Sequence, residues 1–485
     1  MAWDQIEATP AHKAYILLSV FLILYTLFAS FIRNRLHLSE PPLALLMGIL
    51  IGPKVLNWVA PNQCNSIRCS GDIEQYSSSS WGWGDDVIQE TTRVIVGIQV
   101  FTVGITLPRH YATKHWKSVA ILLGPVMAFG WLVCAAFVYF LFQTDFLTAL
   151  TIAACLTPTD PVLSASILSN SQFSSRVPKR IKNMLAAESG CNDGVSFPFL
   201  YVGLFALLNR TAGGAVREYF LVTILWQCVF GILVGLVIGT FFNITLRFTE
   251  KRGYVEDSGL TAFYLLLALL CVGVGSMLGS DDFLVAFGAG YGFARDGWFT
   301  KKIQSAHLPE VIDLLLNSAM FVYLGTIIPW QSISTIETWK IALFAVLVLL
   351  FRRMPIVLAV YRFTPDIRTL REAGFVGWFG PMGLGGLFLA MEARAMLETG
   401  KSIPLPHPPR YEYPLTDRQQ AVELIWPIVC SVVVASTFVH GLSVLGLSIA
   451  GHIRRDEGER APLIGGETEP LTGMVHSESE GEDDG

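Results

Sequence analysis

The feature that most limits the fold of this chain is a long apolar run with two prolines near its middle. Residues 144–169 have enough length to cross a membrane as one helix, but Pro158 and Pro161 interrupt them within Leu-Thr-Pro-Thr-Asp-Pro. Proline lacks a backbone N–H and its ring clashes with the preceding turn, so the helix cannot continue unbroken here. In a bilayer, the freed backbone groups must face protein or a water-filled cavity. The run therefore predicts two half-helices joined by an unwound segment.

Carboxylates lie at the same depth as this break. Asp160 belongs to the break, and Asn192 and Asp193 lie near the middle of the next apolar run, within Glu-Ser-Gly-Cys-Asn-Asp-Gly at 188–194. A carboxylate in mid-membrane is costly and usually has a function. We predict a site for a cation and a proton at this depth. The alternative is that both carboxylates are structural, each satisfied by a helix end or an arginine.

The composition extends this interpretation to the whole chain. Of the 485 residues, 52% are hydrophobic and only 15% are charged, which is too apolar for a soluble protein. Thirteen apolar segments have helical length, namely 13–33, 43–60, 87–107, 118–142, 145–169, 180–208, 219–246, 258–279, 282–295, 309–329, 338–361, 371–392 and 421–450. We predict an all-α polytopic membrane protein with about thirteen transmembrane helices in a lipid bilayer and no nucleic-acid partner.

The positive charges predict how the chain is oriented. With the N-terminus outside, the cytoplasmic loops carry twenty-one Lys and Arg residues and the opposite side carries ten, including Arg394. The positive-inside rule favours this arrangement, with the C-terminus in the cytoplasm. Residues 1–12 then form an extracellular segment and residues 13–450 the transmembrane domain. Residues 451–485 form an acidic cytoplasmic tail that we predict to be disordered.

The odd number of segments allows two halves of opposite orientation. If segments one to six and eight to thirteen are repeats, they form an inverted repeat in which the two fifth segments correspond. The first of these carries the proline break, and the second, 371–392, is rich in glycine and contains Pro381. We predict two broken helices that cross near the midplane. The alternative is that these glycines only allow close helix packing.

Six motifs occur in a characteristic order. They are Thr-Asp-Pro at 159–161, the 188–194 motif, Ser-Asp-Asp-Phe-Leu-Val-Ala-Phe at 280–287, Phe-Val-Tyr-Leu-Gly-Thr-Ile-Ile-Pro-Trp at 321–330, Phe-Arg-Arg-Met-Pro-Ile-Val at 351–357 and Trp-Phe-Gly-Pro-Met-Gly at 378–383. Together they resemble the fungal plasma-membrane sodium/proton antiporters, which belong to the monovalent cation/proton antiporter family. The likeness covers about residues 10–450.

This resemblance implies a function and an assembly. It implies a plasma-membrane homodimer whose subunits each have a dimerisation domain beside a core domain. It also implies elevator-like exchange of cytosolic Na⁺ or Li⁺ for external H⁺, with K⁺ as a further candidate substrate. No enzymatic activity and no cofactor are expected.

The resemblance also assigns roles to individual residues. It implies that Asp193 is the ion-binding carboxylate, with Asn192 beside it. Thr159 and Asp160 would contribute from the crossing helix, so that Na⁺ would lie at Asp193 and Asp160. Asp281 and Asp282, in the 280–287 motif, are further candidates.

A structural ion pair is expected at Glu188. In the animal and plant exchangers of the wider family, this glutamate pairs with an arginine just before the glycine of the twelfth-span motif, where the present chain has Phe379. Arg352 and Arg353 are intramembrane cations in the 338–361 segment and are the candidate substitutes. The alternative for at least one of them is that its side chain extends to the inner membrane surface.

The chemistry of the predicted site favours exchange. Na⁺ prefers carboxylate, hydroxyl and carbonyl oxygens, and the break supplies all three. If one carboxylate binds either H⁺ or Na⁺, exchange is obligatory, because only the loaded site is neutral enough to cross. A cation channel or another cation-coupled transporter is the alternative, although a channel needs a continuous polar pore. An intramembrane protease would need a catalytic pair, and Asn192 and the prolines suit ion coordination better.

Overall fold

The computed structural model describes residues 9–61, 83–108, 110–168, 177–208, 211–300, 308–406, 411–412, 414–443 and 445–446. Within these residues the structure is helical and contains no strand, which confirms the predicted all-α class. Residues 1–8 and the predicted tail at 451–485 lie outside the described part, so the structure does not test either terminal segment.

Each half of the chain contributes a similar series of helices. The first half contains α1 (Pro10–Asn34), α2 (Glu40–Ile51), α3 (Asp85–Thr106), α4 (Tyr111–Ile121), η1 (Leu122–Val126), α5 (Met127–Phe142), α6 (Phe146–Ala154), α7 (Pro161–Leu168) and α9 (Lys179–Leu208). A long connection follows, made of α10 (Ala212–Glu218), η2 (Tyr219–Phe230) and α11 (Gly231–Lys251). The second half contains α12 (Asp257–Met277), α13 (Asp282–Phe293), α15 (Leu308–Ile327), α16 (Trp330–Thr335), α17 (Thr338–Phe351), α18 (Met354–Val360), η3 (Tyr361–Phe363), α19 (Leu370–Trp378), α20 (Leu384–Thr399) and α21 (Asp417–Gly441).

The helices agree with the predicted spans in position. Each predicted segment coincides with one helix or with consecutive helices, although the count of thirteen spans itself stays a prediction. Within the described residues, seven helical stretches are long and apolar enough to cross a membrane. The remaining segments are shorter or broken. The chain is therefore a polytopic membrane protein.

Both predicted breaks are present. The fifth segment divides into α6 and α7 between Ala154 and Pro161, and its counterpart divides into α19 and α20 between Trp378 and Leu384. The two unwound segments touch, because the backbone N–H of Asp160 donates a hydrogen bond to the carbonyl oxygen of Pro381 at 2.8 Å. The broken helices therefore meet at their breaks.

Two boundaries in the second half differ from the prediction. Helix α20 continues past Glu392 to Thr399 and ends at Gly400, which adopts a left-handed φ of 71°. Arg394, which the charge count places in a loop, is buried within this helix. Helix α21 begins at Asp417 because Thr416 and Gln419 form a reciprocal capping box. Hydropathy misplaces both boundaries because it treats charged residues as ends of spans.

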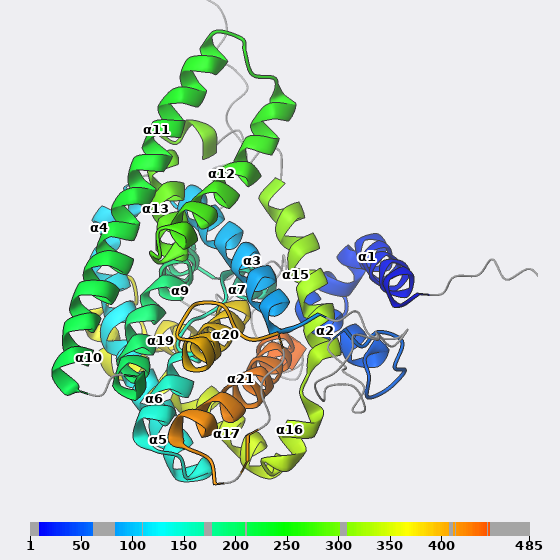
Figure 1. The fold of residues 1–485 in the computed structure, drawn as a ribbon. Coiled ribbons are helices and arrows are strands. Elements are labelled where there is room, and N and C mark those ends of the chain that lie inside the picture. Colours follow the sequence, from blue (N-terminus) through cyan, green and yellow to red (C-terminus); the bar gives the residue numbers. More distant parts are fainter. Residues whose placement is uncertain are drawn as a thin grey trace, which may run out of the picture.

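The exterior of the bundle is apolar. Figure 1 shows α1 at one edge of the bundle and α11 along the other, with α13 between α11 and α12. Large apolar side chains are exposed on the outer helices; Leu27 on α1, for example, is 71% exposed. Such surfaces are typical of helices that face lipid.

Candidate ion-binding site

The carboxylate of Asp160 caps two half-helices at once. Its Oδ1 accepts a hydrogen bond from the backbone N–H of Leu163 at 2.8 Å, in the first turn of α7. Its Oδ2 accepts a hydrogen bond from the backbone N–H of Leu384 at 3.2 Å, at the start of α20. Helix N-termini carry unpaired N–H groups and a partial positive charge, both of which stabilise an anion. Asp160 therefore joins the two broken helices at their crossing.

Asp193 reaches the same crossing from α9. A Cβ atom added at Gly385 would lie 2.0 Å from Asp193 Oδ1, and one added at Gly383 would lie 2.0 Å from Asp160 Oδ2. The two carboxylates therefore fill the space that these two glycines leave open, at the beginning of α20. Asp193 is buried, and its Oδ1 has no hydrogen-bond partner among the described residues.

A short chain of polar side chains lies beside Asp193. The amide nitrogen of Asn192 donates a hydrogen bond to Thr159 Oγ1 at 2.7 Å. Thr159 Oγ1 lies 2.9 Å from Ser189 Oγ in a second hydrogen bond. These contacts turn the amide oxygen of Asn192 away from Thr159, and this oxygen is buried without a partner among the described residues. The structure thus places Thr159 and Asn192 in contact beside Asp160 and Asp193 at the crossing, and one oxygen of Asn192 and one of Asp193 lack a partner among the described residues.

The two aspartates at the start of α13 have different surroundings. Asp281 caps the helix, since its Oδ1 accepts hydrogen bonds from the backbone N–H groups of Phe283 and Leu284, each at 3.0 Å. Its Oδ2 is unpaired within the described residues and would lie 3.2 Å from a Cβ added at Gly194. Asp281 therefore borders the site next to Asp193.

Asp282 faces a different part of the molecule. Its Oδ2 lies 2.9 Å from Arg93 Nη1 on α3 and accepts a hydrogen bond from Ser276 Oγ at 3.0 Å. The ion pair with Arg93 and the hydrogen bond from Ser276 hold this carboxylate in place. Of the two further candidates, only Asp281 lies at the site with an available oxygen.

Glu188 forms a buried ion pair with Arg353. The two guanidinium nitrogens contact Glu188 Oε1 and Oε2 at 2.5 and 2.7 Å. Arg353 Nε also donates a hydrogen bond to the carbonyl oxygen of Val376 at 2.8 Å, which attaches the pair to α19. A bidentate contact of this kind satisfies both charges.

Arg352 makes a different set of contacts. Its Nη1 donates to the carbonyl oxygens of Leu156 and Thr157 at 2.6 and 3.1 Å, and its Nη2 donates to that of Gly380 at 2.6 Å. These oxygens belong to the unwound segments that follow α6 and α19. Helix C-termini carry unpaired carbonyls and a partial negative charge, which a cation stabilises. Arg352 thus stabilises the C-terminal ends of the half-helices at the crossing, and Asp160 stabilises their N-terminal ends.

A third break separates the roles of the two arginines. Helix α17 ends at Phe351 and α18 begins at Met354, so Arg352 and Arg353 lie between two helices and extend in different directions. Sequence reasoning missed this break, although Pro355 in the first turn of α18 is a signal for it.

Sequence reasoning also missed a polar cluster where α3 and α20 meet. The carboxylate of Glu392 accepts hydrogen bonds from Gln89 at 2.8 Å, Tyr201 at 3.1 Å and Ser402 at 2.6 Å. Arg394 pairs with Asp85 and with Glu398, both at 2.8 Å. The spacing of four residues between Arg394 and Glu398 is typical of an ion pair within one helix and was the available signal. Arg394 is held by two carboxylates and Glu392 by three neutral hydrogen-bond donors, so the cluster fixes α20 against α3.

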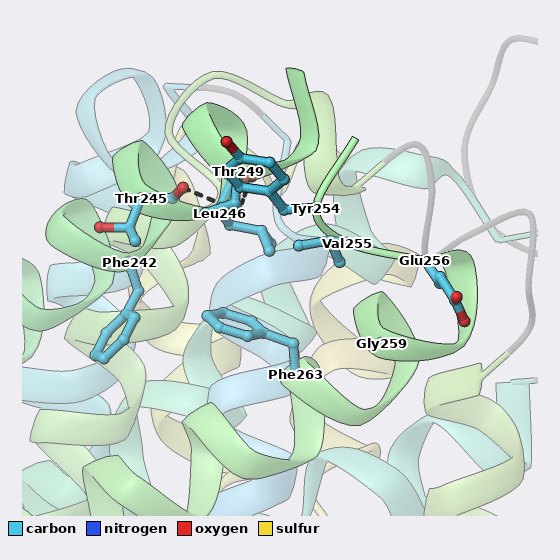
Figure 2. A pocket seen from close by; sticks show the side chains of 9 residues that line it. All are labelled: Phe242, Thr245, Leu246, Thr249, Tyr254, Val255, Glu256, Gly259 and Phe263. Atoms are coloured by element: carbon cyan, nitrogen blue, oxygen red, sulfur yellow. Dashed lines mark hydrogen bonds between the residues drawn. The ribbon is translucent and has the colours of Figure 1, made fainter. Parts of the chain in front are cut away.

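A cavity lies away from the ion-binding site. It has a volume of about 530 Å³ and opens between the end of α11 and the start of α12. Among the residues that line it, Figure 2 shows Phe242 and Phe263 lowest in the view, Tyr254 above them and Glu256 to the right. The hydroxyl of Thr249 is satisfied by the carbonyl oxygens of Thr245 and Leu246 in its own helix. None of the predicted site residues lines this cavity.

Known proteins resemble this chain in both sequence and fold. The sequence profile of the family described as "Sodium/hydrogen exchanger, transmembrane" matches residues 18–448. The chain belongs to this family. The predicted resemblance is therefore confirmed, and the crossing of broken helices lies within the matched exchanger region.

Fungal relatives of this exchanger-family chain are similar over most of its length. It is 40% identical over 449 residues to a probable Na⁺/H⁺ antiporter of Schizosaccharomyces pombe, covering 92% of this chain and 57% of the relative. It is also 40% identical to Na⁺/H⁺ antiporter 2 of Zygosaccharomyces rouxii, covering 93% of this chain and 55% of the relative. The chain thus spans about half the length of these relatives.

One solved structure shows the same fold. The sodium proton antiporter MjNhaP1 from Methanocaldococcus jannaschii matches with a TM-score of 0.62, covering 92% of this chain and 98% of that one. The sequence identity is 20%, so this similarity supports the fold alone. It agrees with the observed polytopic helical architecture.

Proposed function

We propose that this exchanger-family protein is a secondary active antiporter that exchanges cytosolic Na⁺ or Li⁺ for external H⁺. K⁺ is a further candidate substrate. The observation that carries the proposal is the pair of unpaired buried oxygens, Asp193 Oδ1 and Asn192 Oδ1, beside the crossing of two broken helices. Buried polar atoms usually have partners, so two adjacent exceptions indicate a place for an ion or water.

The donors around these oxygens suit a monovalent alkali cation. Asp193 would contribute the charge, and Asn192 would contribute a neutral oxygen. Asp160 already accepts two backbone hydrogen bonds, so we assign it the role of an anchor and neighbouring ligand. Ion-coordinating oxygens from broken helices in mid-membrane are a recurrent arrangement in secondary transporters.

Competition for one carboxylate would couple the two ions. With neither H⁺ nor Na⁺ bound, Asp193 would be a buried anion without a paired cation, and burying such a charge is costly. Binding of either ion neutralises this charge. Alternating access then follows if only a neutral site can change its exposure from one side of the membrane to the other.

We also propose the cellular setting. The protein would act in the plasma membrane as a homodimer, with the N-terminus outside and the C-terminus in the cytoplasm. The orientation rests on the distribution of Lys and Arg between the loops. The plasma membrane and the homodimer rest on the resemblance to the fungal antiporters.

A vesicle assay tests this function. Purified protein in proteoliposomes with a preset pH gradient should dissipate the gradient when Na⁺ or Li⁺ is added. An exchanger must do so without a net current if the two ions compete one for one, whereas a cation channel would carry current with no pH change. Absence of cation-dependent proton flux in vesicles with correctly inserted protein would contradict the proposal.

A further inference from the structure

Helix α15 carries a polar pair that the site above does not use. Asn317 is 1% exposed, and neither its Oδ1 nor its Nδ2 has a hydrogen-bond partner among the described residues. Asp313 precedes it by one helical turn, and its buried Oδ1 is also unpaired in that part of the chain. Residues four apart lie on the same face of a helix. Burying an amide with neither group satisfied is unfavourable, so the pair requires an explanation.

The surroundings of the pair are acidic. Three acidic groups act electrostatically on the carboxyl group of Asp313: Asp160 at the crossing, Glu310 on the same helix and Glu40 on α2. Glu40 is fixed by a hydrogen bond from Ser318, the residue after Asn317. Among the described residues, no Lys or Arg pairs with Asp313. A group of acidic residues without a fixed cation attracts mobile cations.

The position of the pair fits an access route. At 1.5 Å per residue, Asp313 and Asn317 lie about 7.5 and 13.5 Å along α15 from its first residue, between the end of the helix and its middle. The connection before α15 contains Arg295, Lys301 and Lys302 and is cytoplasmic in the orientation that we propose. In that orientation the pair lies in the cytoplasmic half of α15, and Asp160 of the crossing is among the charges that act on Asp313.

We infer that Asp313 and Asn317 form a second, transient cation site through which Na⁺ passes between the cytoplasm and Asp193. A carboxylate and an amide oxygen provide the same ligand types as Asp193 and Asn192. This inference rests on the proposed antiport function. It adds an entry site that Na⁺ uses and that H⁺ does not require.

The first test compares two acidic residues on one helix. Asp313→Asn keeps the shape of the side chain and removes its charge, and the control Glu310→Gln does the same at an exposed position one turn earlier. In proteoliposomes, Asp313→Asn should raise the KM for Na⁺ about tenfold, because it removes the local attraction, and leave the maximal rate within about twofold. Glu310→Gln removes a more exposed and better screened charge, so it should raise the KM for Na⁺ much less than Asp313→Asn and leave the maximal rate close to the wild-type value.

The second test separates a functional role from a structural one. Asn317→Leu breaks no hydrogen bond seen in the structure and removes an unsatisfied amide, so the thermal unfolding midpoint should stay the same or rise. The KM for Na⁺ should nevertheless increase. If Asn317 had a purely structural role, its substitution would not combine an equal or higher unfolding midpoint with a higher KM for Na⁺.

The outcomes are distinguishable. If wild-type protein exchanges ions and both Asp313→Asn and Asn317→Leu keep the wild-type KM, the second site does not exist. The same conclusion follows if Asn317→Leu only lowers the unfolding midpoint. If the wild-type protein itself shows no cation-dependent proton flux, the proposed function fails instead.

Discussion

Glu188 and Asp193 lie five residues apart on the same buried helix, yet their carboxylates have opposite environments. Glu188 is held in a bidentate contact by Arg353, whereas Asp193 has an oxygen with no partner among the described residues. The difference shows how one membrane helix contains both a structural and an available carboxylate. A fully paired carboxylate stabilises the fold, and an unpaired one remains free to bind H⁺ or a cation.

The largest effect is expected at the unpaired carboxylate. Asp193→Asn should reduce Na⁺-driven proton flux to the background of empty vesicles, because an amide can neither take up the proton nor carry the charge. The protein should still insert and keep its stability, since Asp193 Oδ1 makes no hydrogen bond that the change removes. Full flux through purified Asp193→Asn protein would refute the assignment.

Substitution of the paired carboxylate, Glu188, should lower the stability of the protein. Removing one partner of a buried ion pair leaves an isolated charge, which costs about 3–5 kcal/mol. Glu188→Gln and Arg353→Gln should therefore each lower the unfolding free energy, and the double variant should lose much less than their sum.

Arg352 provides the control for this cycle, because it contacts backbone carbonyls and not Glu188. The effects of Glu188→Gln and Arg352→Gln should be close to additive. The assignment would be wrong if the strong coupling occurred with Arg352 and not with Arg353.

Glycine-to-alanine substitutions in the second broken segment test whether the carboxylates need the space that the glycines leave open. A Cβ at Gly385 would lie 2.0 Å from Asp193 Oδ1, whereas one at Gly374 meets nothing within 4 Å. Gly385→Ala should cost about 1–3 kcal/mol through overpacking and should weaken Na⁺ binding by displacing the carboxylate. Gly374→Ala should leave transport unchanged; equal loss in both variants, measured by vesicle flux, would show that the clash is not the cause.

The smallest effect is expected at Asp160, which combines features of both environments. Asp160→Asn keeps one oxygen that can accept the hydrogen bond at one helix end and places an NH₂ group at the other. It also loses the negative charge that both ends favour, worth about 0.3–1 kcal/mol at each end. The KM for Na⁺ should rise several-fold, at least as much as the maximal rate falls. If neither changes in a vesicle assay, the break at Asp160 has only an architectural role.

The sequence was sufficient to predict the positions of most spans and the broken helices, because proline and apolar length act locally. The prolines at 158 and 161 identify the first break directly, and the glycines near Pro381 identify the second. The family resemblance added the candidate residues around Asp193. Each of these signals lies within a short stretch of chain.

The pairing of charges could not be predicted in the same way. Glu188 and Arg353 are 165 positions apart, and only the fold shows that Arg353 takes the carboxylate while Arg352 takes the carbonyls. Asp281 and Asp282 look alike in sequence, but a turn at the start of α13 directs one to the site and the other to Arg93. Such choices depend on long-range packing.

The central claim is that one carboxylate, Asp193, binds either a proton or a cation. It is tested most directly by measuring proton release from purified protein in weakly buffered detergent solution when Na⁺ is added. We predict the release of about one proton for each Na⁺ bound at a pH where the cation-free site is protonated, and no release from Asp193→Asn protein. Saturable Na⁺ binding to the wild-type protein without proton release would contradict the account.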